Sequence, residues 1–374
     1  MIYFDNAATY INDNKDVIDV FIRATNEYPA NTSSTHRLGY YANKKLDELR
    51  ADVIHLLKLN KDYEVIFNSG ATEGINHAIK GYALRNRSRG NEIICFKNEH
   101  PAVLNSVAYL SKIGFKIIYI NPDKSGSIIV DEIKNQINNN TIMVIAMSVN
   151  NEIGSINDLN QIYNIVKKYP KCVLFSDVTQ SIGKINFNYN NLDMFAFSIH
   201  KIGGIIGSGI LVKKKKILLD KLIDGGPQEN NYRPGTVSLP LIISSVYALK
   251  KAINNLLENY KHVYELNLHL HAHLKRIDEV FINSNSDFPY IVNFSLKSKR
   301  ASVVIEALSS KEIYVSSLSA CNSKHNVVST NLLNMGVDKR LAENSIRVSF
   351  SNKNTLNEVD TFIKILKEIL ERIR

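Results

Sequence analysis

The sequence lacks tryptophan and has only three cysteines among its 374 residues. Three cysteines cannot form a disulfide framework, and their odd number leaves at least one thiol free, as a reducing compartment allows. No apolar stretch approaches the length of about 18 to 20 residues that a membrane-spanning helix needs. Residues 1–6 also lack the basic and apolar regions of a secretory signal. These absences exclude a disulfide scaffold and a membrane protein, and they predict a cytoplasmic location.

Positive charge is in surplus, with 46 Lys+Arg against 36 Asp+Glu and a formal net charge of +10. RNA-binding proteins have such a surplus, but here the lysines are scattered and no motif of aromatic and basic residues accompanies them. We therefore interpret the charge as a solvated surface and expect no direct contact with nucleic acid.

From about residue 60, short apolar runs alternate with segments of helical periodicity, which is typical of an α/β domain with three layers and a mainly parallel sheet. The predicted strands are 64–67, 92–96, 115–120, 142–149, 172–176, 194–198 and 210–212. The predicted helices among them are 71–84, 102–113, 131–137 and 159–169. After Pro240 the pattern changes to a long helical run over residues 241–277 and then to a smaller α+β unit. We predict a segment of residues 1–14 that joins the small domain, a large domain of residues 15–250 and a small domain of residues 251–374.

Polar residues follow the predicted strands, at the end of a sheet where α/β proteins bind ligands. Residues 68–74 form a glycine-bearing turn that opens a helix, and the N–H groups of a helix N-terminus suit a phosphate. His100 and Asn151 follow two other strands. Asp177 directly follows a buried run and needs a cationic partner to stay charged. Lys201 stands at a further strand end beside two glycines, where a desolvated amine becomes reactive.

Each of these residues alone has an ordinary structural explanation, but their conjunction matches what pyridoxal phosphate needs. That cofactor requires a lysine that forms a Schiff base, an acid that pairs with the pyridine nitrogen and a cradle for the phosphate. The chain also resembles the cysteine desulfurases of the class V aminotransferase group, which are fold-type I pyridoxal phosphate enzymes. The resemblance runs in order along almost the whole chain, from residues 3–9 to beyond residues 345–347. It is carried by NSGATE (68–73), EH (99–100), VNNEIG (149–154), DVTQSIGK (177–184) and SIHK (198–201).

This resemblance implies a role for each candidate residue. Lys201 is expected to bind the cofactor covalently and move protons, Asp177 to pair with the pyridine nitrogen, and Gln180 to bond the phenolic oxygen. His100 is expected to stack on the cofactor ring and to act as an acid and base. The other implied cofactor-binding residues are Ala71, Thr72, Asn151, Ser198, His200 and Thr236.

Within that set, Thr72, Ser198 and His200 are expected to hold the phosphate, and Thr236 to reach the site of the partner subunit in a homodimer. Asn151 and Arg347 are expected to hold the substrate carboxylate, with Arg347 as a fork of two donors. No metal is implied in the site.

The three cysteines lie in different settings. Cys95 and Cys172 lie in apolar runs, which predicts inert packing thiols. Cys321 lies in a polar run of residues 316–323, which predicts an exposed and reactive thiol. The same run resembles the active-site loop of the longer-loop type of cysteine desulfurase, which implies that Cys321 is catalytic and accepts the sulfur.

The implied reaction converts L-cysteine to L-alanine and leaves a persulfide on Cys321. The implied acceptor of that sulfur is a protein of iron–sulfur cluster assembly or tRNA thiolation. A selenocysteine lyase or another class V enzyme is an alternative that need not use Cys321. A non-catalytic partner in sulfur trafficking is a second alternative, although it has no need for Lys201, Asp177 and Cys321 together.

Some positions depart from the family pattern. They are Ile205, Ile206, Asp224, Pro227 and Leu318. None of these departures removes a reacting group, so we expect them to affect rate and acceptor choice rather than the type of reaction.

Overall fold

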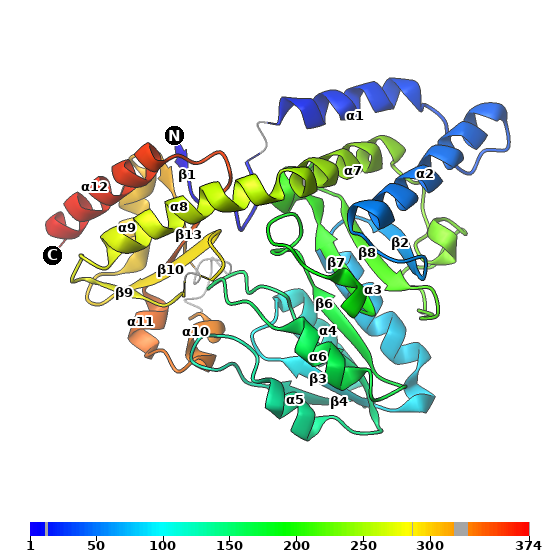
Figure 1. Ribbon diagram of the computed structural model, residues 1–374, viewed down its shortest axis with the longest axis horizontal. Coiled ribbons are helices and arrows are strands. Elements are labelled where there is room, and N and C mark those ends of the chain that lie inside the picture. Colours follow the sequence, from blue (N-terminus) through cyan, green and yellow to red (C-terminus); the bar gives the residue numbers. More distant parts are fainter. Residues whose placement is uncertain (12–13, 286, 318–327, 374) are drawn as a thin grey trace.

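Within the described residues, a seven-stranded sheet forms the centre of the larger unit of the molecule (Figure 1). The computed structural model describes residues 1–11, 14–285, 287–317 and 328–373. The order across the sheet is β2-β8-β7-β6-β5-β3-β4. Its strands are β2 (Tyr63–Asn68), β3 (Glu92–Phe96), β4 (Lys116–Ile120), β5 (Thr141–Ile145), β6 (Val173–Asp177), β7 (Met194–Ser198) and β8 (Gly209–Lys214). Strands β3 to β7 pair in parallel, and β8 is antiparallel to both β2 and β7.

Helices cover both faces of this sheet. Alternate residues of each buried strand point to opposite faces: in β3, Ile94 packs in one apolar cluster and Ile93 in the other. The first cluster also contains side chains of α1 (Lys15–Glu27), α2 (Arg37–Leu56), α5 (Val130–Gln136), α6 (Leu159–Val166) and α7 (Leu239–Asn254). The second contains side chains of α3 (Ala71–Arg85) and α4 (Pro101–Lys112). The three-layer α/β architecture predicted from the sequence is therefore present.

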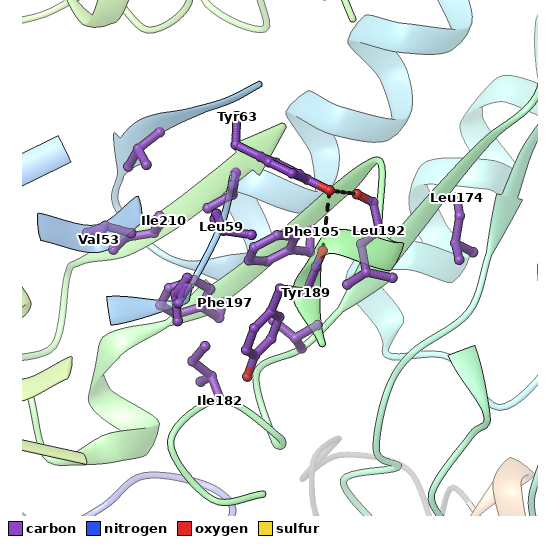
Figure 2. Close-up of a cluster of buried hydrophobic side chains, with 14 of the residues drawn as sticks. Val53, Leu59, Tyr63, Leu174, Ile182, Tyr189, Leu192, Phe195, Phe197 and Ile210 are labelled. Carbon is purple, nitrogen blue, oxygen red and sulfur yellow. Dashed lines mark hydrogen bonds between the residues drawn. The ribbon is translucent and has the colours of Figure 1, made fainter. Parts of the chain in front are cut away.

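Aromatic side chains fill part of the first cluster (Figure 2). Phe195 and Phe197 of β7 stack on one another, with ring centroids 6.4 Å apart. Tyr63 at the start of β2 is also buried here, and its hydroxyl donates to the Leu192 carbonyl at 2.6 Å. A buried hydroxyl without a hydrogen-bond partner is costly. This bond therefore allows Tyr63 to be buried in the cluster, beside the turn that leads into β7.

The smaller unit has an apolar cluster of its own. Its antiparallel sheet has the order β12-β13-β10-β9, and a separate strand, β1, pairs in parallel with β11. The strands are β1 (Ile2–Tyr3), β9 (Val280–Ile282), β10 (Ile291–Leu296), β11 (Ile313–Tyr314), β12 (Ser316–Ser317) and β13 (Ser345–Ser349). The helices are α8 (Leu256–Leu274), α9 (Ala301–Ser309), α10 (Thr330–Asn334), α11 (Lys339–Glu343) and α12 (Leu356–Arg372).

The N-terminal segment packs into this smaller unit. Phe4 is fully buried, and its ring makes edge contacts with Phe350 and Phe362 at centroid distances of 5.3 and 5.8 Å. The segment then runs on to the end of β7, where the Tyr10 N–H donates to the His200 carbonyl at 3.1 Å. Residues 4 to 10 therefore connect the two units.

The predicted helical run over residues 241–277 is wrong in one respect, because it is two helices that meet at Asn255. Helix α7 buries its apolar face in the larger unit, whereas α8 buries its face in the smaller one. Periodicity alone cannot reveal this break, since both helices keep the same apolar spacing. Among the described residues, the structure contains no helix long and apolar enough to cross a membrane.

Candidate functional site

A cavity of about 440 Å³ lies beyond the carboxyl ends of β6 and β7. The N-terminal segment, the start of α3 and the strands β12 and β13 complete its walls. Its lining includes Ala71, Thr72, His100, Asn151, Asp177, Gln180, Ser198, His200, Lys201 and Arg347. Lining residues as far apart in sequence as Asp5 and Arg347, 342 positions, are thus gathered around one space, at the sheet end where α/β folds bind ligands.

Lys201 lies in a short 3₁₀ turn directly after β7. Its Nζ atom donates to the Ala7 carbonyl at 2.6 Å and also to the Ala8 carbonyl. The turn ends at Gly203, which has a left-handed φ of 87°, and a side chain there would lie 2.4 Å from the Asn14 amide. Glycine is therefore required for the N-terminal segment to lie against the turn and hold the amine.

Asp177 is the last residue of β6 and is 6 % exposed. The Thr179 N–H donates to its Oδ1 atom at 2.9 Å and so orients the carboxylate at the base of the cavity. Glu99 is buried nearby and accepts from the Met147 N–H. Burial, together with the charge of Asp177, raises the pKa of Glu99 well above its usual range. Both effects favour the uncharged form of Glu99 beside Asp177.

His100 caps the N-terminus of α4, where its Nδ1 atom accepts from the Ala102 N–H at 3.1 Å. Burial lowers the pKa of His100, and the charge of Asp177 partly opposes that shift. A neutral ring that accepts at Nδ1 carries its proton on Nε2. The cap thus fixes the tautomer as well as the position of this ring at the edge of the cavity.

One end of the cavity is suited to an anion. Helix α3 begins there at Ala71, whose N–H donates to the Ser198 hydroxyl oxygen at 2.7 Å. On the same side, His200 Nδ1 lies 2.8 Å from the Thr9 hydroxyl oxygen. Burial, followed by the charge of Lys201, lowers the pKa of His200 to about 4. A helix N-terminus, two hydroxyl groups and a neutral imidazole are typical partners of a phosphate.

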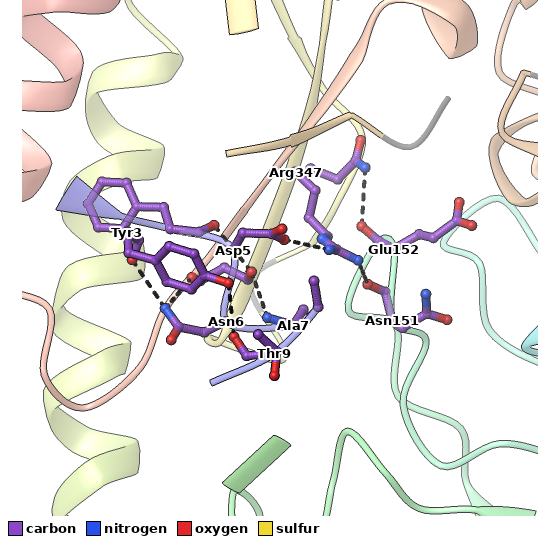
Figure 3. Close-up of polar contacts among 12 residues, drawn as sticks. Tyr3, Asp5, Asn6, Ala7, Thr9, Asn151, Glu152 and Arg347 are labelled. Atoms are coloured by element: carbon purple, nitrogen blue, oxygen red, sulfur yellow. Dashed lines mark hydrogen bonds and ion pairs between the residues drawn. The ribbon is translucent and has the colours of Figure 1, made fainter. Parts of the chain in front are cut away.

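At the other end, Arg347 projects from β13 and is held at both terminal nitrogens (Figure 3). Its Nη1 atom donates to the Asn151 carbonyl at 2.8 Å, and its Nη2 atom bonds Asp5 Oδ1 at 2.8 Å. Each terminal nitrogen of a guanidinium has a second N–H. Arg347 therefore keeps one N–H on each terminal nitrogen for a carboxylate. Its contacts with Asn151 and Asp5 fix the plane of the guanidinium.

Two candidate residues lie outside this group. Thr236 is exposed, is not among the cavity-lining residues, and follows Arg233, which bonds Glu73 of α3 at 2.9 Å. Cys321 lies outside the described residues, and the strand β12 that precedes it lines the cavity. Cys95 and Cys172 are buried as expected, and burial raises the pKa of both thiols.

Sequence reasoning assigned no role to several residues that support the site. Thr9 orients His200, Asp5 orients Arg347, and Lys184 donates to the Gln180 side chain at 3.1 Å. Glu99 and Lys184 lie within the motifs that carry the family resemblance, so their place in the sequence was a usable signal. Asp5 and Thr9 lie within residues 3–9, where the resemblance begins, but only the fold shows that they contact Arg347 and His200.

The donor set fits pyridoxal phosphate. The cavity joins an anion end, a carboxylate at its base, an amine at its wall and a histidine ring at its edge. Thr179 also lines the cavity, and its hydroxyl is buried without a hydrogen-bond partner among the residues that the structure describes. A buried hydroxyl of this kind is explained by a bound polar group.

Comparisons with known proteins agree with this geometry. The model of the class-V aminotransferase family matches residues 2–362. A NifS/IcsS protein homolog of Lactobacillus delbrueckii subsp. bulgaricus is 34% identical over 377 residues, which cover 99% of this chain and 97% of that protein. The cysteine desulfurase IscS of Buchnera aphidicola subsp. Baizongia pistaciae is 36% identical over 383 residues, covering 100% of this chain and 93% of that one. A solved structure titled NifS-like protein has a TM-score of 0.92 at 34% identity and covers 100% of both chains.

Proposed function

Because the chain belongs to the class-V aminotransferase family, and within it to the cysteine desulfurases, we propose that it converts L-cysteine to L-alanine with pyridoxal phosphate as its cofactor. The observation that carries the proposal is the cavity in which Asp177, Lys201 and Arg347 face one space of about 440 Å³. A carboxylate, an amine and a guanidinium at these places suit an amino acid joined to a pyridine aldehyde.

The residues that would hold the cofactor follow from the donor set. The start of α3, with Ala71 and Thr72, would bind the phosphate together with Ser198 and His200. The Asp177 carboxylate would accept a hydrogen bond from the protonated pyridine nitrogen, and Gln180 would donate to the phenolic oxygen. Lys201 would form the covalent bond, and His100 would lie against the ring.

Substrate orientation is the task of Arg347 and Asn151. The two free N–H groups of Arg347 match the two oxygens of the cysteine carboxylate. Because Asp5 and the Asn151 carbonyl already hold the guanidinium, it has little freedom left to lose on binding.

Proton movement falls to Lys201 and His100. Bound pyridoxal phosphate supplies an electron-withdrawing ring that stabilises negative charge at the substrate Cα atom. The Lys201 amine would take the proton from that Cα atom, and the Ala7 and Ala8 carbonyls hold it at the wall of the cavity. The Nε2 atom of His100 carries the proton that a neutral ring exchanges with the substrate.

The sulfur step falls to Cys321. Its thiolate attacks the substrate sulfur, so that a sulfur–sulfur bond forms as the bond between Cβ and sulfur breaks. The electron pair of that bond stays with the carbon skeleton, which takes up a proton and leaves as alanine. The persulfide on Cys321 then passes its sulfur to an acceptor protein, for which we propose a protein of iron–sulfur cluster assembly or tRNA thiolation.

We also propose that two copies of the chain share their sites. Thr236 is exposed and does not line the cavity of its own chain, which supports a contact with the phosphate of a partner subunit. The ion pair between Arg233 and Glu73 ties this loop to the start of α3.

The proposed activity is tested by assaying purified wild type, Cys321→Ala and Lys201→Ala with L-cysteine and a thiol reductant. We expect equal amounts of alanine and sulfide from wild type and neither from either variant. Cofactor absorption in the near-visible range checks that Cys321→Ala is loaded. Equal alanine formation by wild type and Cys321→Ala would instead favour a class V enzyme that does not use this thiol.

A further inference from the structure

Three side chains with no part in the proposed reaction meet where α8 packs against α12, two helices of the smaller unit (Figure 1). His269 and His273 belong to α8, and Asp360 belongs to α12. The Nε2 atom of His269 lies 2.6 Å from Asp360 Oδ1, and the two histidine rings are 4.7 Å apart at their centroids. One nitrogen of each ring and one oxygen of Asp360 all lie within 4.8 Å of one another.

The position of this cluster is fixed by the helix core beneath it. Residues four apart on a helix lie on the same face, so His269 and His273 point the same way. Leu266 and Leu270 on α8 and Val359 and Phe362 on α12 are fully buried in one apolar cluster. That packing holds Asp360 opposite the histidine pair without help from the cluster itself. His271, between the two histidines in sequence, is buried and is not part of the cluster.

Two imidazoles and one carboxylate form a donor set that Zn²⁺ uses in sites with an open coordination position. With ligand bonds of about 2.0 to 2.1 Å, tetrahedral ligand atoms lie about 3.3 Å from one another. The three atoms now lie within 4.8 Å of one another, so side-chain rotations must bring them closer for an ion to bind. His269 is 33 % exposed and Asp360 is 57 % exposed, so both can rotate without disturbing the core.

The charges around the cluster act in opposite directions. Arg276 and Lys367 lie near His273, and Asp360 faces it from α12. The same arginine and lysine repel a cation, whereas the Asp360 carboxylate attracts it. We therefore expect affinity in the micromolar range rather than that of a buried structural zinc site.

We propose that His269, His273 and Asp360 bind a divalent transition-metal ion of the Zn²⁺ class, which joins α8 to α12 on the surface of the smaller unit. The ion completes its coordination with water, because the three protein ligands leave a position open. This proposal does not depend on the proposed reaction, since no residue of the cluster lines the cavity.

The test is calorimetric titration of Zn²⁺ into the cofactor-loaded protein without an affinity tag, in a Cys321→Ser background that removes a competing thiol. We expect one Zn²⁺ per chain and no comparable binding of Mg²⁺, because imidazole ligands favour transition metals. His269→Gln and His273→Gln should each weaken Zn²⁺ binding by at least about tenfold, and Asp360→Asn should weaken it less. Exposed residues outside the cluster provide matched controls, namely His55→Gln on α2 and Glu371→Gln on α12.

Thermal unfolding gives a second readout, because an ion that joins two helices stabilises the folded state. Zn²⁺ should raise the melting temperature of the Cys321→Ser protein and leave that of the His269→Gln, His273→Gln double variant unchanged. Absence of Zn²⁺ binding at millimolar concentration, or equal binding by the double variant, would overturn the proposal. Circular dichroism of each variant without metal shows whether it is folded, and the control variants must bind as the parent does.

Discussion

Lys184 donates a hydrogen bond to the Oε1 atom of Gln180 at 3.1 Å, from a position that is almost completely buried. The Nε2 atom of the same amide donates to the Ala7 carbonyl at 3.1 Å. Because an amide oxygen accepts and its nitrogen donates, Lys184 fixes which way Gln180 faces. Burial, followed by the charge of Lys201, lowers the pKa of Lys184 to about 7. The amide of Gln180 thus keeps its second N–H for the bond that we propose to the phenolic oxygen of the cofactor.

Replacing Lys184 with Met should raise the pH at which the near-visible absorption of the bound cofactor titrates. The reason is that Gln180 loses its anchor, so the phenolate loses a fixed donor. We expect an increase of about 0.5 to 1 in the apparent pKa of the bound cofactor, which corresponds to about 1 kcal/mol. Lys184→Arg should restore most of the wild-type value, and the exposed Lys168→Met is the control for loss of charge. An unchanged titration in Lys184→Met would show that Gln180 does not depend on this bond.

Because Asp5 forms an ion pair with Arg347, we predict that replacing Asp5 changes KM more than kcat. Asp5→Asn leaves the Arg347 charge in place but replaces the ion pair, one of the two contacts that hold its plane, with a weaker bond to a neutral acceptor. We expect the KM for L-cysteine to rise by about tenfold, since a hydrogen bond to a charged group contributes about 1.5 to 3 kcal/mol, while kcat changes less. Steady-state kinetics measure both constants, with the exposed Asp278→Asn as the control. A fall in kcat with an unchanged KM would contradict the assigned role of Asp5.

We predict that the buried His77 makes the stability of the folded protein depend on pH, independently of catalysis. This residue of α3 is buried, its Nε2 atom has no hydrogen-bond partner among the described residues, and burial lowers its pKa to about 4. Because the unfolded chain binds this proton near pH 6.5 and the folded chain does not, stability is lost as pH falls from 6.5 toward 4.

Between pH 7 and pH 5, we expect wild type to lose roughly 1 to 2 kcal/mol more unfolding free energy than His77→Leu. Urea denaturation of both proteins at the two pH values measures this difference. The comparison concerns the pH slope, so a general loss of stability in His77→Leu does not affect it. Parallel pH curves for the two proteins would rule out titration of His77 as the cause.

Local patterns predicted much of the fold, and the reasons are visible in particular elements. The buried strands β3, β6 and β7 are continuous apolar runs, which are typical of a parallel sheet covered on both faces. Their positions led directly to Asp177 and Lys201, because the ligand site of such a sheet follows its strands. The break at Asn255 was not predictable, because it depends on which core each helix joins.

Contacts between residues far apart in the sequence also could not be predicted. Asp5 meets Arg347, and Thr9 meets His200, only because the N-terminal segment passes between the two units. Neither residue has a neighbour in sequence that suggests its partner. The candidate site residues could be named from their motifs, whereas the contacts that hold them in place required the structure.

Mapping of the persulfide tests the proposed reaction most directly. Cofactor-loaded wild type is mixed with one equivalent of L-cysteine without reductant, alkylated, digested and analysed by mass spectrometry, with Lys201→Ala treated in parallel. We predict that the peptide containing Cys321 gains the mass of one sulfur atom in wild type only, and that the peptides containing the buried Cys95 and Cys172 gain none. Alanine formation with no added sulfur on Cys321, or with the sulfur on Cys95 or Cys172, would contradict the assignment of Cys321 as the sulfur acceptor.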